Sequence, residues 1–438
     1  MTADARTGLY LKWSYATILN MANKKAANSK GINPKDWKTK LIHSDATVPE
    51  GFRSLATPVY RGSTVLFDEA AAASDRWNQF DIGYTYGLYG TPTTMELAAK
   101  VCELEKGFRT FITPGGQAAI SLIHLALLKA GDHVLLPESI YGPNRMFSNG
   151  VLRRFGVEVS YYPPDAGAGI RAEFKPNTRL VWCESPGSIT MEVQDLPAIA
   201  QATHEHGALA VLDNTWAAGI YLDAFAMGMD VTMQALTKYV GGHSDLLLGS
   251  VTVRPEQMDS QVASRSVNAK LSAQEIYERL GDTHQVLGCA ASPDDCSLAL
   301  RGLKTMAVRL KAVEQNALAL ARWLSTRPEV ETVLHPALPS CPGHELWKRD
   351  FTGASGLFSV VFKPQYSKEQ VLAFIDALQL FKIGYSWGGV TSLVMTYDLQ
   401  SPKRPAYGSR LVRLYTGLEA IEDLIADVEQ ALERLITE

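Results

Sequence analysis

An acidic residue and a lysine each follow a short apolar run in the middle of the chain. Ala208-Leu-Ala-Val-Leu212 is followed by Asp213, and Val231-Thr-Met-Gln-Ala-Leu236 is followed by Thr237 and Lys238. Runs of this kind are typical of strands that a parallel sheet buries on both faces, and we expect a helix between them. Because ligands of open α/β sheets bind outside the carboxyl ends of the strands, the pattern predicts a carboxylate and an amine at the mouth of one crevice.

Pyridoxal phosphate (PLP) chemistry uses such a pair of groups. A lysine amine bonds covalently to the cofactor aldehyde, and a carboxylate keeps the pyridine nitrogen protonated so that the ring accepts electrons. Thr237 could offer its hydroxyl to the phosphate. The alternative is that Asp213 caps the next helix and Lys238 is a solvated loop residue. The position of both groups at strand ends favours the PLP site and leaves that alternative open.

A glycine-rich turn and a tyrosine are further candidates for cofactor binding. Thr113-Pro-Gly-Gly-Gln117 precedes a helical pattern, and the backbone N–H groups of a helix start bind phosphate. Many helices begin after glycine, so this signal is weak by itself. Tyr141 follows the apolar run His133 to Leu136 and could stack on a flat cofactor, although a turn tyrosine is the alternative.

One arginine lies in an apolar strand pattern near the C-terminus. Arg413 is flanked by apolar residues in Arg410-Leu-Val-Arg-Leu-Tyr415. A buried guanidinium is costly without a partner, so we expect either a bound carboxylate or a salt bridge to an Asp or Glu. We expect no metal site, because His204 and His206 are two positions apart on a helix and do not converge. His124 lies in an apolar stripe and is interpreted as a packed residue.

Apolar runs alternate with helical patterns over residues 95–285, which is typical of a doubly wound α/β domain. Residues 286–438 indicate a smaller α+β domain whose first helix begins at Ser292-Pro-Asp-Asp295. Residues 39–94 are rich in Tyr, Gly and Pro and predict an irregular arm, either a plain loop or an interface segment. Residues 1–38 lack periodicity and predict a mobile tail.

The composition excludes several classes of protein. The 438 residues are 46% hydrophobic and 20% charged, which is ordinary for a soluble globular chain. A net charge of −4 argues against nucleic-acid binding, and no apolar run is long enough to span a bilayer. The five cysteines are scattered without paired spacing, so we expect neither disulfides nor zinc, and a cytoplasmic location.

Several blocks together resemble one family. They are Glu184-Ser-Pro-Gly-Ser-Ile-Thr-Met-Glu-Val193, Asp213-Asn-Thr-Trp-Ala-Ala-Gly219, Thr237-Lys-Tyr239, Gly242-His-Ser-Asp245, His335-Pro-Ala-Leu-Pro339, Trp347-Lys-Arg-Asp-Phe-Thr352 and Tyr385-Ser-Trp-Gly-Gly389. From about Lys40 onward the chain resembles the Cys/Met-metabolism family of fold-type-I PLP enzymes, most closely its cystathionine β-lyases. The resemblance implies a mostly parallel sheet in a large PLP-binding domain and a smaller C-terminal domain.

The resemblance also implies a role for each candidate residue. Lys238 would carry the cofactor and move a proton from Cα to the departing sulfur, Asp213 would pair with the pyridine nitrogen, and Tyr141 would stack on the ring. Tyr86 would reach the phosphate from a neighbouring subunit, in an oligomer that is usually a tetramer of two active dimers. The other implied residues are Gly115, Gly116, Gln117 and Thr237 for the phosphate, and Arg413, Ser386, Tyr385 and Trp387 for the substrate.

The implied reaction is β-elimination of cysteine thioethers, first of all cystathionine, which gives homocysteine, pyruvate and ammonia. A γ-lyase, γ-synthase or cysteine desulfhydrase on the same scaffold is the alternative, and a cofactor-free binding protein is a different class. The sequence departs from the β-lyase pattern at Leu88 and Tyr89, where arginines are expected, and at Met146, where an acidic residue is expected. Arg61 is a candidate for the missing phosphate charge.

Overall fold

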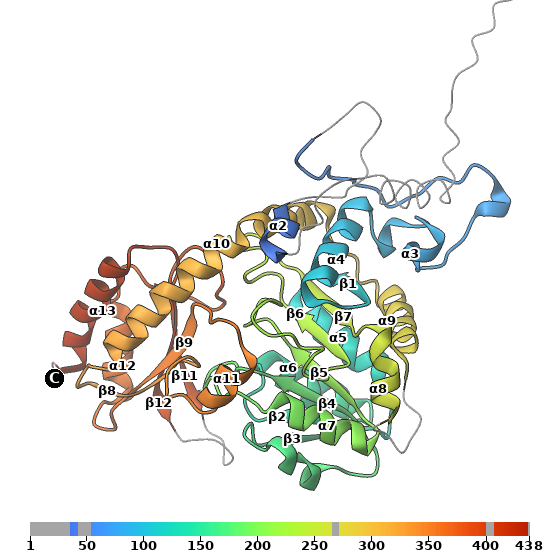
Figure 1. Cartoon of the computed structure of the whole chain (residues 1–438). Coiled ribbons are helices and arrows are strands. Elements are labelled where there is room, and N and C mark those ends of the chain that lie inside the picture. Colours follow the sequence, from blue (N-terminus) through green and yellow to red (C-terminus); the bar gives the residue numbers. More distant parts are fainter. Residues whose placement is uncertain (1–35, 43–53, 265–270, 400–406, 437–438) are drawn as a thin grey trace, which may run out of the picture.

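A seven-stranded sheet forms the larger part of the molecule. The computed structural model describes residues 36–42, 54–264, 271–399 and 407–436 (Figure 1). In spatial order the strands are β1 (Arg109–Thr113), β7 (Gly249–Val253), β6 (Val231–Gln234), β5 (Leu209–Asp213), β4 (Thr178–Glu184), β2 (His133–Pro137) and β3 (Glu158–Tyr162). From β3 to β6 neighbouring strands run parallel, and β7 runs antiparallel to β6 and β1. The predicted mostly parallel α/β sheet is therefore confirmed.

Helices cover both faces of this sheet, so its central strands are buried on both sides. On β5, Leu209 and Val211 join one apolar core with α5 (Gly116–Leu127) and α9 (Ala273–Leu287). Ala210 and Leu212, which point the other way, join a second core with α7 (Leu196–His206). This double burial explains why the strand has a continuous apolar sequence.

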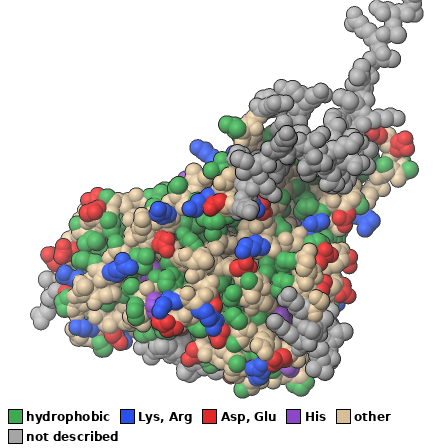
Figure 2. Space-filling view, in the orientation of Figure 1, with side chains coloured by type: hydrophobic (Ala, Val, Ile, Leu, Met, Phe, Trp, Pro, Cys, Tyr) green, Lys and Arg blue, Asp and Glu red, His purple; other side chains and the backbone are tan. Residues whose placement is uncertain are grey.

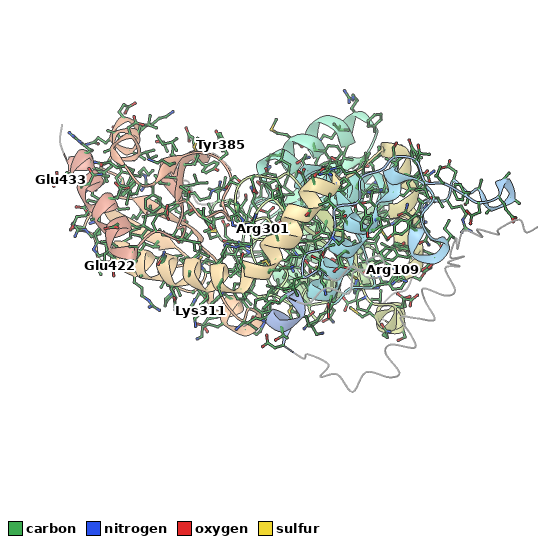
Figure 3. The ribbon with its side chains drawn as sticks, turned by 90° about the horizontal axis from the view of Figure 1, so that it is seen from above. Arg109, Arg301, Lys311, Tyr385, Glu422 and Glu433 are labelled. Carbon is green, nitrogen blue, oxygen red and sulfur yellow. The ribbon has the colours of Figure 1, made fainter. Side chains whose placement is uncertain are left out.

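A five-stranded sheet follows in the last third of the chain. Its order is β10 (Lys382–Ile383), β11 (Leu393–Leu399), β12 (Gly408–Tyr415), β9 (Leu357–Phe362) and β8 (Val330–Leu334), and only β10 and β11 pair parallel. A third core joins this sheet to α10 (Pro293–Leu324), α12 (Lys368–Ala377) and α13 (Ile421–Ile436). The long α10 runs between the two sheet regions, with Arg301 and Lys311 along it (Figures 1 and 3).

The expected start of α10 is confirmed, while one other helix prediction needs correction. Ser292 caps α10 through its hydroxyl, which accepts a hydrogen bond from the N–H of Asp295 at 3.4 Å. The helix expected between the strands at 208–212 and 231–236 is wrong, because residues 214–230 form turns with Gly219 and Gly228 in left-handed backbone. Helix α4 (Pro92–Glu105) ends before Lys106, which has left-handed backbone.

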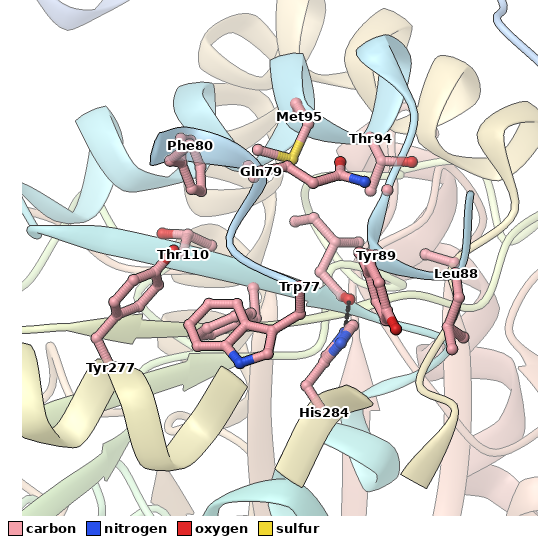
Figure 4. Close-up of a pocket in the computed structure, with 15 residues that line it drawn as sticks. Trp77, Gln79, Phe80, Leu88, Tyr89, Thr94, Met95, Thr110, Tyr277 and His284 are labelled. Carbon is pink, nitrogen blue, oxygen red and sulfur yellow. Dashed lines mark hydrogen bonds between the residues drawn. The ribbon is translucent and has the colours of Figure 1, made fainter. Parts of the chain in front are cut away.

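Residues 54–90 form an arm that extends away from the sheets (Figure 1). Its elements are η1 (Ala70–Ala72), α3 (Gln79–Ile82) and η2 (Gly87–Tyr89), and Thr64 bridges Tyr86. Trp77 anchors the arm to α9: its Nε1 donates to Asp282 Oδ1 at 2.7 Å, and its ring lies edge-on to Tyr277 (Figure 4). This anchor holds the arm against α9.

The remaining short elements are α2 (Trp37–Ile42), α6 (Gly142–Phe147), η3 (Ser148–Leu152), η4 (Gly167–Glu173), η5 (Glu256–Met258), α8 (Asp259–Ser264) and α11 (His344–Asp350). The first 35 residues of the predicted tail lie outside the described residues, and the proposed domain boundaries stay predictions. No helix of the described ranges is long and apolar enough to cross a membrane. Acidic and basic side chains are interspersed over the face shown in Figure 2.

Candidate active site

A cavity of about 370 Å³ opens at the carboxyl ends of β4, β5 and β6. Its lining includes Asp213 and Lys238, and the chain segments that bring them there are the two strands predicted from their apolar runs. Gly115 to Gln117, Tyr141, Thr237 and Trp387 also line it. The structure therefore brings most of the residues expected to bind the cofactor to one place.

Asp213 ends β5 and is held by the residue two positions later. Its Oδ1 accepts hydrogen bonds from the Thr215 backbone N–H at 3.0 Å and the Thr215 hydroxyl at 2.5 Å. The Thr215 oxygen accepts in turn from the N–H of Ala235, which follows β6. Burial raises the pKa of Asp213, while the bonds from Thr215 and the charge of Lys238 oppose this rise. The sequence analysis missed Thr215, although Asp-x-Thr is a recognisable turn signature.

Lys238 lies half-buried in the cavity, close to residues of the five-stranded sheet region. Its Nζ donates to Ser386 Oγ at 2.5 Å and lies 5.4 Å from the ring centroid of Trp387. Burial and, to a lesser extent, the charge of Arg413 lower the pKa of Lys238 to about 8, against the opposing charge of Asp213. An amine with this pKa is partly neutral near neutral pH, as a base must be.

The glycine turn lies at the N-terminus of α5, next to the segment after β6. A Cβ on Gly116 would lie 2.8 Å from the Cβ of Ala235, so a side chain there would collide with that segment. The first N–H groups of α5 have no partner within the helix and lie at the cavity. Thr237 lines the cavity, but its hydroxyl donates to Leu248 O and accepts from Leu248 N, each at 3.1 Å.

Tyr141 lies at the rim of the cavity, with 39% of its surface exposed. Its backbone N–H donates to Glu184 Oε2 at 2.7 Å, so the last residue of β4 fixes the position of this tyrosine. Glu184 is buried and lines the cavity. The sequence analysis assigned it no role, although it ends a strand in the same way as Asp213.

Arg413 is buried behind the cavity wall, with 7% of its surface exposed. Its Nη1 donates to the backbone oxygen of Ser188 at 3.2 Å, and Ser188 lines the cavity. None of the ion pairs between described residues includes Arg413, so no salt bridge of the expected kind is present there. Tyr385 is 71% exposed and lies on the side of the five-stranded region that adjoins the larger region (Figure 3).

The structure does not bring Tyr86 into the cavity of its own chain. Its surface is 42% exposed, and its ring lies edge-on to Tyr89. The hydroxyl of Tyr89 donates to Asp75 Oδ1 at 2.7 Å and accepts from Gln285 Nε2 at 2.9 Å. The Tyr89 side chain therefore ties the arm to α9. It lies beside Leu88 in the small pocket of Figure 4.

The third departure, Met146, and Arg61, the candidate for the missing phosphate charge, also lie away from the cavity. Met146 on α6 is 75% exposed and is absent from the cavity lining. The guanidinium of Arg61 pairs with Asp294 at the start of α10, where Nε donates to Oδ2 at 2.9 Å. Arg61 is therefore engaged by Asp294 within its own chain.

Within the described ranges, no cluster of three or more His, Cys, Asp or Glu side chains could hold a metal ion. His124 is buried with its Nε2 3.1 Å from Asn144 Oδ1, as expected of a packed residue. His204 pairs instead with Asp230 Oδ2 at 2.9 Å. All of the cysteines are free thiols.

The residues of this cavity fit pyridoxal phosphate. The volume lies in the range of cofactor pockets, and a carboxylate and an amine of lowered pKa lie within it. Position 116 has no room for a side chain, so backbone N–H groups at the N-terminus of α5 face the cavity directly. Such N–H groups suit an anionic phosphate. The guanidinium of Arg413 has no ion pair within the described ranges and donates to Ser188 O behind the cavity wall, where a carboxylate could meet it.

Known proteins resemble this chain over nearly its whole length. Residues 38–433 match the family described as Cys/Met metabolism PLP-dependent enzymes. A Rhizobium johnstonii protein is 44% identical over 91% of this chain and 95% of its own. Cystathionine beta-lyase MetC of Escherichia coli is 36% identical over 92% of this chain and 99% of its own.

A solved structure agrees with these sequence relatives. The cystathionine gamma synthase of Xanthomonas oryzae pv. oryzae, in complex with aminoacrylate and cysteine, superposes with a TM-score of 0.81. It is 27% identical, over 92% of this chain and 99% of its own. The chain therefore belongs to the Cys/Met-metabolism family of PLP-dependent enzymes.

Proposed function

We propose that the protein is a PLP-dependent carbon–sulfur lyase that eliminates the sulfur from Cβ of cysteine thioethers, with L-cystathionine as the first substrate. The products are homocysteine, pyruvate and ammonia. The observation that carries the proposal is one cavity that holds Asp213 and Lys238, with the buried Arg413 behind its wall. Relatives named cystathionine beta-lyase, such as that of Escherichia coli, support the choice of reaction.

The bound cofactor supplies an electron-withdrawing ring that acidifies the Cα–H of an amino acid. We assign Asp213 to the pyridine nitrogen, because its carboxylate is fixed by Thr215 and lies at the end of β5. Tyr141, positioned by Glu184, would cover the ring of the bound cofactor, and the N–H groups of Gly115, Gly116 and Gln117 would hold its phosphate. Thr237 contributes there only if its hydroxyl leaves Leu248.

Lys238 both anchors the cofactor and moves the proton. With the cofactor bound, Lys238 would hold it, and its neutral Nζ would take the proton from Cα of the substrate. The C–S bond then breaks with its electron pair on sulfur, and Nζ gives the proton to the departing thiolate. Water releases the remaining three carbons and the nitrogen as pyruvate and ammonia. The hydrogen bond from Nζ to Ser386 Oγ keeps the amine near Cα between these transfers.

Arg413 binds the substrate α-carboxylate, and the backbone at Ser386 assists it. The planar guanidinium of Arg413 matches a carboxylate in geometry and charge, so the substrate carboxylate takes the place of the acidic side chain with which Arg413 forms no ion pair in the described ranges. Tyr385 and Trp387 line the distal side, where the thioether substituent lies. Because Leu88 and Tyr89 stand where the family pattern has arginines, cysteine S-conjugates with a smaller or less charged substituent are substrates to test beside cystathionine.

A product assay tests the proposal. Incubation of the holoenzyme with L-cystathionine should give pyruvate and homocysteine. Formation of 2-oxobutyrate and cysteine would instead identify the protein as a γ-lyase, the main alternative. Cystine, cysteine and S-alkyl cysteines extend the panel. The Lys238→Ala variant is the blank: we expect a folded protein without turnover and without a borohydride-sensitive yellow chromophore. Turnover by this variant at the parental rate would refute the role of the lysine.

We further propose that the protein is a cytoplasmic homo-oligomer, a tetramer of two active dimers, in which Tyr86 reaches the phosphate of the neighbouring subunit. The exposure of Tyr86 and its place on an arm that extends from the sheets support this arrangement (Figure 1). The five free cysteines suit a reducing compartment.

A further inference from the structure

The buried guanidinium of Arg413 is held by few polar contacts. Its only side-chain hydrogen bond within the described ranges is the one from Nη1 to Ser188 O at 3.2 Å. A guanidinium has five N–H donors in a planar fork, so a single bond leaves its rotation poorly defined. Something else must fix the plane of the fork toward the cavity.

The neighbouring strand supplies an aromatic ring at this point. In the antiparallel pair of β11 and β12, Met395 lies directly opposite Arg413. Tyr397 is two residues farther along β11, so its side chain projects from the same face and reaches Arg413 diagonally. The guanidinium carbon lies 4.8 Å from the centroid of the Tyr397 ring, which is cation–π geometry.

Little water reaches the guanidinium, because Arg413 is 7% exposed, and this burial lowers its pKa. Tyr397 is half-buried and packs against the same apolar core as Trp387, so its ring has little freedom to move away. The guanidinium is thus held between a rigid ring and the backbone of Ser188.

We propose that Tyr397 is a positioning residue that orients the Arg413 fork for the α-carboxylate of the substrate. The inference rests on the proposed function, in which Arg413 binds that carboxylate. The α-carboxylate does not change charge during the elimination, so its contact is equally strong in the ground and transition states. Loss of such a contact raises KM and leaves kcat nearly unchanged.

The test compares Tyr397→Leu, which removes the ring, with Tyr397→Phe, which keeps it. For L-cystathionine we expect Tyr397→Leu to raise KM about tenfold with kcat within about twofold of wild type, as for a desolvated cation–π contact. Tyr397→Phe should recover a KM within about twofold of wild type, because the hydroxyl plays no part in the contact.

A binding measurement on the holoenzyme separates this role from general damage. L-alanine and ethylamine are matched amine ligands, of which only L-alanine carries a carboxylate, and both are titrated by cofactor absorbance. Tyr397→Leu should weaken L-alanine about tenfold and leave ethylamine unchanged. Unchanged L-alanine binding, equal weakening of both ligands, or a Tyr397→Phe variant as weak as Tyr397→Leu would each overturn the proposal. If wild type gives no pyruvate from any thioether, the proposed function fails, while the two amines still decide the role of Tyr397.

Discussion

Glu105 connects the two segments that carry the site, and its titration should be visible in the stability of the fold. It ends α4 and is 3% exposed. Its carboxylate accepts hydrogen bonds from Asn214 Nδ2 at 3.1 Å and from Gln234 Nε2. Asn214 follows Asp213, and Gln234 lies four residues before Lys238, so this buried side chain ties the ends of β5 and β6 together.

Burial outweighs the hydrogen bonds from the two amides, so the pKa of Glu105 is raised from 4.5 to about 7. Between these two values the folded protein keeps a proton that the unfolded chain has lost, so stability falls as the pH rises. At 1.36 kcal/mol per pKa unit, the loss between pH 5 and pH 8 amounts to roughly 2 to 3 kcal/mol. The neutral amide that Glu105→Gln introduces cannot titrate, so this substitution removes the pH-dependent contribution.

The assay is urea unfolding of both holoenzymes at equal subunit concentration, followed by tryptophan fluorescence at pH 5 and pH 8. We expect wild type to lose roughly 2 to 3 kcal/mol of unfolding free energy relative to Glu105→Gln over this interval. Glu103→Gln, on the same helix but partly exposed, leaves Glu105 intact and should follow wild type. A difference between wild type and Glu105→Gln that stays constant within about 0.5 kcal/mol would show that the buried carboxyl keeps its ordinary pKa and refute the reasoning.

Two further predictions concern the arm. A Cβ on Gly281 would lie 2.1 Å from the Trp77 ring, so Gly281→Ala should displace the arm and lower both the melting temperature and the cofactor affinity. Gly150→Ala, in open space, should lower neither. An unchanged cofactor affinity of Gly281→Ala would show that the anchor is dispensable. If Tyr86 acts in the neighbouring site, co-expression of Tyr86→Leu with Lys238→Ala should restore about a quarter of the wild-type activity, because half of the dimers are mixed and each has one intact site. If the mixed dimers were as inactive as the two parent variants, Tyr86 would act in the site of its own subunit.

Local sequence was enough for the elements that carry the chemistry. Asp213 and Lys238 follow apolar runs typical of strands buried on both faces, and parallel strands bring their carboxyl ends to one edge. The start of α10 was equally readable, because the cap at Ser292 and the proline after it act within one turn. These features depend on residues that are neighbours along the chain.

The tertiary structure alone decided the contacts between distant segments. Residues 214–230 form turns where a helix was expected, and some of their glycines have left-handed backbone. The spacing of apolar residues along the chain does not reveal such backbone, because tertiary packing holds it in place. Lys238 meets Ser386 across 148 positions, and Glu105 meets Gln234 across 129. The ring of Tyr397 reaches Arg413 only because β11 and β12 pair in one particular register. Periodicity encodes which face of an element is buried, whereas the partner of each buried polar group is set by how the elements pack.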